Sequence, residues 1–366
     1  MSEPLKHECG IALIRLRKPL RHYQQKYGST LYGLNKLYLL MEKQHNRGQD
    51  GAGVATIKLD PEPGQNFMDR DRSTDKDAIQ KIFGRIQKDY AGIVAEAGEK
   101  KKDAQWLKDK VPYLGEVLLG HLRYATYGRD GLENCHPRRR LNNWLTRNLV
   151  VAGNFNMTNV DELFDLLVSI GQHPKERSDT MTVLEKIGHF LDVENERLAQ
   201  LYKQLGYNDR QITQVIAEKL DVRSVLRNSA VDFDGGYALA GMIGHGDAFV
   251  LRDPAGIRPA FWYSDEEVVV AASERPAIQT AFAVKADQVR ELTPGHALII
   301  RKNGEVSEEL VREPLEKRSC SFERIYFSRG SDMDVYRERI ELGRRVVPQI
   351  LDAVHHDVEN TVFSFI

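Results

Sequence analysis

The sequence predicts an α+β domain, and three observations carry that prediction. Several short segments are apolar, or alternate apolar and polar residues, and turn-forming residues separate them, which is typical of strands. Helical patterns lie between some of these segments, but strands and helices do not alternate regularly. No G-x-G-x-x-G follows a strand, which argues against a Rossmann unit. We therefore expect hairpin-like strands with helices between them, in a layered domain from Cys9 to about Leu310.

The predicted strands are short, apolar and flanked by turn-forming residues. They comprise residues 9–16, 51–59, 115–126, 148–157, 235–244, 247–256, 266–274 and 296–304. Residues 29–44 have Leu31, Leu34, Leu37 and Tyr38 at helical spacing, and residues 161–172 and 181–228 also have helical patterns. Residues 61–110 are polar and rich in Lys and Asp, and we expect a helical insertion with mobile joints outside the core.

Length and composition restrict the class of protein. The 366 residues are enough for roughly two domains of about 150 residues each. The chain has 52 basic and 53 acidic residues, so its net charge is −1. This balance gives no electrostatic case for nucleic acid or an anionic membrane as partner. No segment approaches the length of a membrane span, and the leader "MSEPLKHE" lacks the apolar region of a secretory signal.

The cysteines point to a reducing compartment. Cys9, Cys135 and Cys320 are too few and too scattered for a disulfide framework or a structural zinc site, so we expect a cytoplasmic protein. The basic run "HPRRR" at residues 136–140 is expected to be a solvated loop. After Arg318 the pattern changes to a predicted strand, a polar turn, a helix and an apolar run in which the chain stops. We expect a fragment that is cut early in a second domain.

Four polar, glycine-containing or short acidic islands interrupt the apolar pattern at residues 44–53, 120–128, 152–159 and 177–180. Loops at strand ends are where rigid scaffolds present functional groups. Each island alone has an ordinary explanation, since Arg123 could cap a helix, Asn154 could be a turn residue and Asp179 an N-cap. Cys9 could likewise be a small buried thiol.

Taken together and in order, Cys9-Gly10 and these islands resemble the glutamine amidotransferase domain of the N-terminal nucleophile class. The resemblance implies a four-layer αββα sandwich of two antiparallel sheets between helical layers. It implies a propeptide at residues 1–8, the amidotransferase domain at residues 9–318 and the truncated start of an α/β phosphoribosyltransferase domain at residues 319–366.

The chemistry explains why Cys9 should become the first residue. Amide hydrolysis needs a nucleophile and a base for its proton, and the α-amino group of an N-terminal cysteine, with a pKa near about 8, can be that base. A peptide nitrogen has no basic lone pair. The resemblance therefore implies self-processing between Glu8 and Cys9.

The remaining site residues follow from the same resemblance. Asn154 and the backbone N–H of Phe155 would stabilise the oxyanion. Arg123 suits the α-carboxylate of glutamine and Asp179 suits its α-ammonium. The other implied substrate-binding residues are Arg47, Gly48, Thr126 and His136. Three departures matter. Phe155 stands where the family usually has glycine and would be strained if φ were positive, and Asn46 is inserted between His45 and Arg47. The segments at residues 61–110 and 181–228 exceed what the core needs and are expected to decorate the sheet edges.

The C-terminal part of the sequence indicates which family of amidotransferases the chain resembles. Segments such as "LRDPAGIRPAFWY" and "CSFERIYFSRGSDMDVYRERIELGR" resemble amidophosphoribosyltransferases, in which Glu323, Tyr326, Phe327 and Arg329 would serve the interdomain joint and ammonia passage. Such an enzyme transfers ammonia from glutamine to phosphoribosyl pyrophosphate, giving 5-phosphoribosylamine for purine synthesis. The resemblance implies a homo-oligomer, with no metal or cofactor in this chain and Mg²⁺ in the missing phosphoribosyltransferase domain.

Three alternatives remain open. A leader that is not removed would leave a non-processed glutamine-binding regulatory domain. The charged helices of residues 181–228 could form an interaction module, although they are most simply solvated faces. A sugar-phosphate amidotransferase would be favoured if the missing half carried isomerase sequence.

Overall fold

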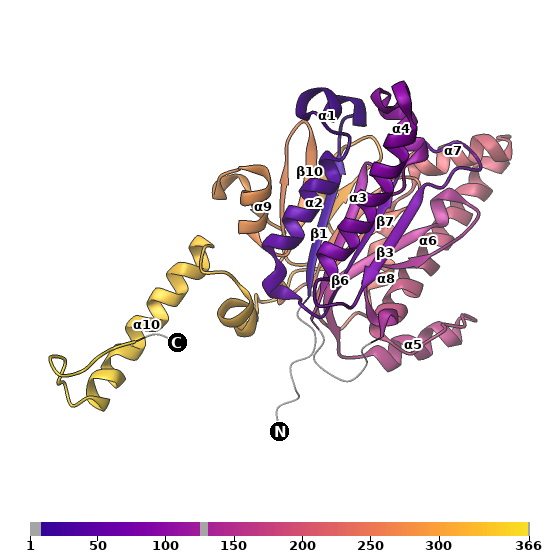
Figure 1. Cartoon of the computed structure of the whole chain (residues 1–366). Helices are drawn as coiled ribbons and strands as arrows, with labels where there is room; N and C mark the ends of the chain where they lie inside the picture. The colour runs from indigo at the N-terminus through magenta and orange to yellow at the C-terminus, as the bar shows by residue number, and fades with distance from the viewer. Residues whose placement is uncertain (1–8, 125–130, 365–366) are drawn as a thin grey trace.

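A computed structural model describes residues 9–124 and 131–364, and these residues form two antiparallel sheets. The strand order is β11-β9-β10-β1-β4-β2-β3 in the first sheet and β13-β12-β8-β7-β6-β5 in the second. Helices cover the outer face of each sheet, so the layers run helices, sheet, sheet, helices (Figure 1). The predicted α+β class with antiparallel strands is confirmed.

The strands lie close to where the sequence predicts them. The first sheet consists of β1 (Gly10–Leu16), β2 (Gly51–Ile57), β3 (Met68–Ser73), β4 (Val117–Arg123), β9 (Phe261–Ser264), β10 (Val268–Ala272) and β11 (Arg290–Glu291). The second consists of β5 (Arg138–Arg140), β6 (Leu149–Met157), β7 (Gly235–Ile243), β8 (Ala248–Arg252), β12 (His296–Ile300) and β13 (Val306–Leu310). Five strands were not predicted from the sequence because they are short or polar: β3, β5, β9, β11 and β13.

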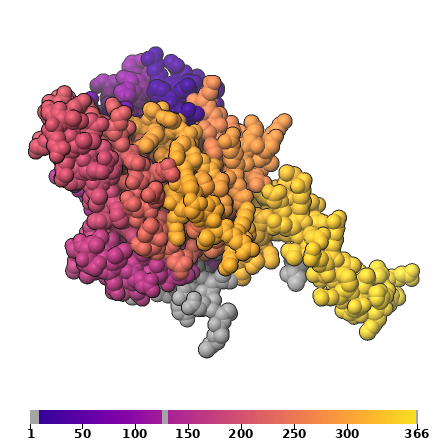
Figure 2. Space-filling model, turned by 180° about the vertical axis from the view of Figure 1, so that it is seen from behind, coloured from indigo at the N-terminus to yellow at the C-terminus, as the bar shows by residue number. Residues whose placement is uncertain are grey.

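Each sheet has its own group of helices. The first is covered by α1 (Leu20–Tyr27), α2 (Tyr32–Lys43), α3 (Ala78–Glu96), α4 (Ala104–Lys110) and α9 (Arg275–Phe282). The second is covered by α5 (Val160–Ser169), α6 (Asp179–Gln204), α7 (Asp209–Lys219) and α8 (Val222–Ala230). The last helix, α10 (Met333–Ala353), projects from this body (Figures 1 and 2).

Both faces of the central strands are buried, which explains why they read as nearly continuous apolar runs. In β1, Ile11 packs between the sheets, whereas Ala12 faces the helices. In β6, Ala152 packs between the sheets, whereas Val151 faces the helices. Because side chains alternate along a strand, Asn154 continues the series that points between the sheets.

Three expectations from the sequence are wrong. Residues 61–110 are not an insertion outside the core, since β3 pairs with β2 and α3 buries Ile79 and Phe83 in the helix–sheet core. The run at residues 136–140 is not a solvated loop, because β5 pairs with β6 at the edge of the second sheet. Among the described residues after 318 there is no strand; a π-helical turn, η6 (Glu323–Phe327), precedes α10.

The charged helices of residues 181–228 have an ordinary structural role. Within α6 to α8, apolar residues such as Leu191, Ile216 and Leu226 bury one side against the second sheet. This packing accounts for the segment without an interaction module. Within the described ranges, no helix is both long and apolar enough to cross a membrane.

Candidate functional site

The site begins where the first sheet meets the second. Cys9 directly precedes β1 and is buried, and its backbone nitrogen donates a hydrogen bond to Oδ1 of Asn154 at 3.2 Å. Asn154 is fully buried and reaches this position because its side chain points between the sheets. The structure therefore brings together the predicted nucleophile and the predicted oxyanion donor.

A buried cluster of charges surrounds this contact. Nδ2 of Asn154 donates to Oε1 of Glu323 at 3.0 Å, and Nη2 of Arg47 donates to Oε2 of the same carboxylate. Nε of Arg47 donates to the carbonyl of Cys9 at 3.3 Å, and its Nη1 lies 3.5 Å from Glu274. Burial raises the pKa of Glu274, although the charge of Arg47 opposes that shift. Arg47 thus links the Cys9 backbone to two buried carboxylates.

A cavity of about 430 Å³ opens beside Cys9. This volume falls within the roughly 300–1,000 Å³ of small-molecule sites. Its lining includes five predicted site residues, Cys9, Arg123, His136, Phe155 and Asp179, but not Asn154. The strands, the loop before β5 and the start of α6 meet here, so residues far apart in the chain share one cavity.

The backbone of β6 turns the Phe155 N–H away from β7. Phe155 faces Tyr237 in the register, but the carbonyl of Tyr237 accepts from the Asp253 nitrogen at 2.8 Å on the opposite side. In an antiparallel pair, the N–H and C=O of a residue point to the same side. The Phe155 N–H therefore points to the side where His136 receives the Gly153 N–H. That direction suits its predicted role as an oxyanion donor.

His136 is part of a directed hydrogen-bond chain. Its Nδ1 accepts from the Gly153 nitrogen at 3.2 Å, so the donor proton is on Nε2, which lies 2.7 Å from Oγ1 of Thr180. The Thr180 hydroxyl donates in turn to Oδ1 of Asp179 at 3.2 Å. This chain orients Asp179, which also accepts from the Thr180 nitrogen at the start of α6.

Two predicted substrate-binding residues stand outside the cavity lining and one cannot be placed. Arg47 lies behind Cys9 in the charge cluster. Gly48 packs on the end of β4, where a Cβ would come within 2.6–2.7 Å of the Leu122 and Arg123 backbone, so only glycine permits this close approach. Thr126 lies outside the described residues.

Several residues that line the cavity were not predicted from the sequence: His121, Asn134, Asn156, Arg177, Ser178 and Thr180. The sequence could have indicated His121, because it lies two residues before Arg123 on the same predicted strand. Side chains two residues apart on a strand share a face, as Leu119, His121 and Arg123 do. Burial lowers the pKa of His121 to about 3, although the hydrogen bond to the Gly153 carbonyl opposes this. The ring is therefore neutral at pH 7, with its proton on Nε2, 3.2 Å from that carbonyl.

The predicted strain at Phe155 does not occur. Phe155 lies in extended strand β6 and is not among the described residues with positive φ. Its ring packs over Gly153, where a Cβ would come within 2.4 Å of the ring atoms. The ring also stacks on His136, with the ring centroids 5.6 Å apart. The ring therefore narrows the cavity without distorting the backbone. Among the described residues, no cluster of three or more His, Cys, Asp or Glu could hold a metal ion.

No protein-family model matches the chain. Among curated proteins, the amidophosphoribosyltransferase of Bacillus subtilis (strain 168) is 32% identical over 363 residues, covering 97% of this chain and 59% of that protein. Amidophosphoribosyltransferase 2, chloroplastic, of Arabidopsis thaliana is 27% identical and covers 96% of this chain and 49% of that protein. The Pasteurella multocida amidophosphoribosyltransferase is 28% identical, with 93% and 56% covered. The chain spans between about half and three fifths of these relatives.

Solved structures give the same relationship at the level of the fold. The glutamine phosphoribosylpyrophosphate amidotransferase of B. subtilis, complexed with ADP and GMP, superposes with a TM-score of 0.57 at 23% identity, covering 88% of this chain and 53% of that chain. A structure described as the allosteric regulatory enzyme of purine biosynthesis gives a TM-score of 0.55 at 25% identity with the same coverage.

Proposed function

Since this chain is homologous to the amidophosphoribosyltransferases over nearly its whole length, we propose that it is the glutaminase part of such an enzyme. It hydrolyses glutamine to glutamate and ammonia through the Cys9 thiolate. The single observation that carries this proposal is the hydrogen bond between the Cys9 nitrogen and Asn154, beside a cavity that Cys9, Arg123 and Asp179 line.

The nucleophile is the Cys9 thiol, and its base is the α-amino group that forms when the leader is removed. The amine takes the thiol proton, the thiolate attacks the amide carbon of glutamine, and the carbon–nitrogen bond breaks as the amine returns the proton to the leaving ammonia. Water then hydrolyses the thioester to glutamate and regenerates the thiol. Asn154 supports this role because its Oδ1 already accepts from the Cys9 nitrogen.

The oxyanion of the tetrahedral intermediate needs donors that are already in place. We assign this role to Nδ2 of Asn154 and the N–H of Phe155. The Phe155 N–H points away from β7, and Asn154 is hydrogen-bonded to the Cys9 nitrogen, and these two observations support the assignment. The neutral ring of His121 closes the wall of the same cavity.

Glutamine brings a carboxylate and an ammonium that need partners of opposite charge. Arg123 is expected to pair with the α-carboxylate through its planar guanidinium. Asp179 is expected to receive the α-ammonium, in the orientation that Thr180 and His136 give its carboxylate. We also assign Gly48 and Thr126 to glutamine binding, on the resemblance alone. Gly48 lets its loop approach the end of β4.

The whole reaction of the relatives is a further proposal. We propose that the complete enzyme transfers the ammonia to phosphoribosyl pyrophosphate, with the Mg²⁺ expected for that step, in the part of the relatives beyond the matched length. The N-terminal nucleophile class, the domain limits at residues 8 and 318, the cytoplasmic location and the homo-oligomer belong to the same proposal.

The test compares two forms of the chain, one with residues 1–8 and one that begins at Cys9. Release of glutamate and ammonia is measured after the N-terminus of each preparation has been read by intact mass. We expect hydrolysis only from the form that begins at Cys9, and background rates from its Cys9→Ala variant. Cys320→Ala is the matched control, because this thiol lies outside the cavity lining.

Two outcomes would contradict the proposal. Full hydrolysis by Cys9→Ala would remove the nucleophile from the mechanism. Binding of glutamine without hydrolysis by the form that begins at Cys9 would leave the glutamine-binding regulatory domain as the function.

A further inference from the structure

Glu323 enters the site from outside the two sheets. It begins η6, beyond the last strand β13, yet its side chain is only 2% exposed. Its carboxylate contacts Asn154 and Arg47, and Nη1 of Arg258 lies 3.5 Å from its Oε1. Both carboxylate oxygens of Glu323 therefore lie close to nitrogen atoms of buried side chains. The C-terminal segment thus places a buried carboxylate directly on the predicted oxyanion donor.

That contact determines which way the Asn154 amide faces. Glu323 accepts hydrogen bonds here, through Oε2 from Arg47 and through Oε1 from the NH₂ group of Asn154 at 3.0 Å. The amide is planar, so the same constraint turns Oδ1 toward the Cys9 nitrogen, 3.2 Å away. Nδ2 carries two hydrogens, and the bond to Glu323 uses one of them. The second hydrogen is used by neither of these two contacts.

We propose that Glu323 is a positioning residue for glutamine hydrolysis, which holds the Asn154 amide with its NH₂ group ready for the oxyanion and its carbonyl on the Cys9 nitrogen. This inference rests on the proposed glutaminase function. It gives the C-terminal segment a direct part in the glutaminase site, because the orientation of the oxyanion donor depends on a residue outside the sandwich.

A second contact ties the same segment to the Arg47 loop. The side chain of Asn46 donates to the Phe327 carbonyl at 2.5 Å and to Glu274 at 2.8 Å, and its Oδ1 accepts from Arg329 at 2.9 Å. Asn46 is the residue inserted into the family motif. The insertion therefore supplies the side chain that fastens η6 and the following turn beside Arg47.

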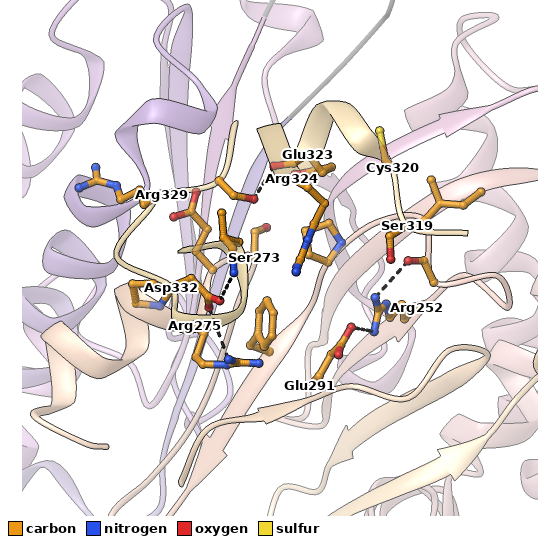
Figure 3. A pocket seen from close by; sticks show the side chains of 18 residues that line it. Arg252, Ser273, Arg275, Glu291, Ser319, Cys320, Glu323, Arg324, Arg329 and Asp332 are labelled. Carbon is orange, nitrogen blue, oxygen red and sulfur yellow. Dashed lines mark hydrogen bonds and ion pairs between the residues drawn. The ribbon is translucent and has the colours of Figure 1, made fainter. Parts of the chain in front are cut away.

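An ion pair also links the C-terminal segment to the sandwich. Glu323 and Cys320 border a small cavity of about 40 Å³ between the segment and the sandwich, on whose wall Arg275 pairs with Asp332 (Figure 3). Asp332 is the N-cap of α10 and accepts from the nitrogens of Asp334 and Val335. The Arg275–Asp332 pair therefore links the start of α10, beyond Glu323, to the sandwich.

The main experiment uses the form that begins at Cys9 and compares Glu323→Gln with wild type. Glutamine at this position keeps the shape but can present either oxygen or NH₂, so it no longer selects one orientation of Asn154. We expect kcat for glutamine to fall by about 10-fold or more, with KM unchanged within twofold, since the oxyanion contact acts in the transition state. Glu323→Asp, which keeps the acceptor, should recover part of kcat.

Glu338→Gln is the matched control. Glu338 lies on α10 and pairs with Arg324 of η6 at the surface. The change therefore removes a negative charge from the same segment at a position that does not contact Asn154. We expect kcat and KM of this variant to equal those of wild type.

A readout without catalysis separates this inference from the proposed function. In protein labelled with ¹⁵N-asparagine, the side-chain amide signal of Asn154, assigned by its loss in Asn154→Ala, should shift in Glu323→Gln and stay in place in Glu338→Gln. If wild type hydrolyses no glutamine, the glutaminase proposal fails, while this signal still tests the contact. An unshifted signal, an unchanged or increased kcat, or a change confined to KM would overturn the positioning role.

Discussion

The backbone nitrogen of Cys9 donates to Oδ1 of Asn154 at 3.2 Å, across the space between the two sheets. In this chain the nitrogen still belongs to the peptide bond with Glu8. The same hydrogen bond could hold the free amine once that bond is cut, because an amine also donates to a carbonyl oxygen. The base of the proposed mechanism would then be formed in a position that the fold has already set.

Asn154→Ala tests the oxyanion donor. Loss of one preorganised donor typically lowers kcat by about 10²–10³-fold. We expect that loss in steady-state glutamine hydrolysis, whereas alkylation of the Cys9 thiol by iodoacetamide should continue. Asn35→Ala, at an exposed position of α2, is the control and should leave kcat unchanged. Equal kcat values in the two variants would show that Asn154 is not an oxyanion donor.

Gly48→Ala tests the close approach to β4. The new Cβ would lie 2.6–2.7 Å from the backbone of Leu122 and Arg123, so the strand end must move and carry Arg123 with it. We expect a higher KM for glutamine and a lower unfolding midpoint in urea. Gly84→Ala in α3, where a Cβ has open space, should instead keep KM and stabilise the protein by about 0.5–1 kcal/mol.

His121 predicts a pH dependence of stability. Burial lowers its folded-state pKa from 6.5 to about 3, so between these pH values the unfolded chain binds a proton that the folded chain does not. The free energy of unfolding should therefore fall as pH decreases from 6.5 to 3, by up to about 1.4 kcal/mol per pH unit from this group.

Urea titrations at several pH values measure that slope. In His121→Gln the slope over the same range should be smaller by this contribution, whereas His356→Gln at an exposed position should keep it. Identical slopes in wild type and His121→Gln would mean that His121 is not held neutral by burial.

The thiols should differ in reactivity. Cys135 is fully buried and burial raises its pKa, whereas Cys320 is partly exposed and Cys9 borders the cavity. Mass-spectrometric mapping after brief iodoacetamide treatment at pH 8 should find labels on Cys9 and Cys320 and little on Cys135. Glutamine should protect Cys9 alone. Equal labelling of Cys135 in native and urea-unfolded protein would contradict its burial.

Local pattern was sufficient for much of the fold. The apolar runs at residues 9–16 and 148–157 correspond to β1 and β6, and the spacing of leucines in residues 29–44 corresponds to α2. These elements are long or strongly periodic, so their side chains alone indicate their structure. By contrast, β3 ("MDRDRS") is polar and is a strand only because β2 offers a free edge beside it.

The sequence by itself determined the element types of the central strands, the motif residues Cys9, Arg123, Asn154 and Asp179, and the resemblance to one enzyme family. Only the tertiary structure decided that Arg47 lies behind Cys9 and that Glu323 contacts Asn154, 169 residues away in the chain. Element type follows from local periodicity. Contacts between distant side chains depend on strand order, register and the packing of both sheets, which are properties of the whole folded chain.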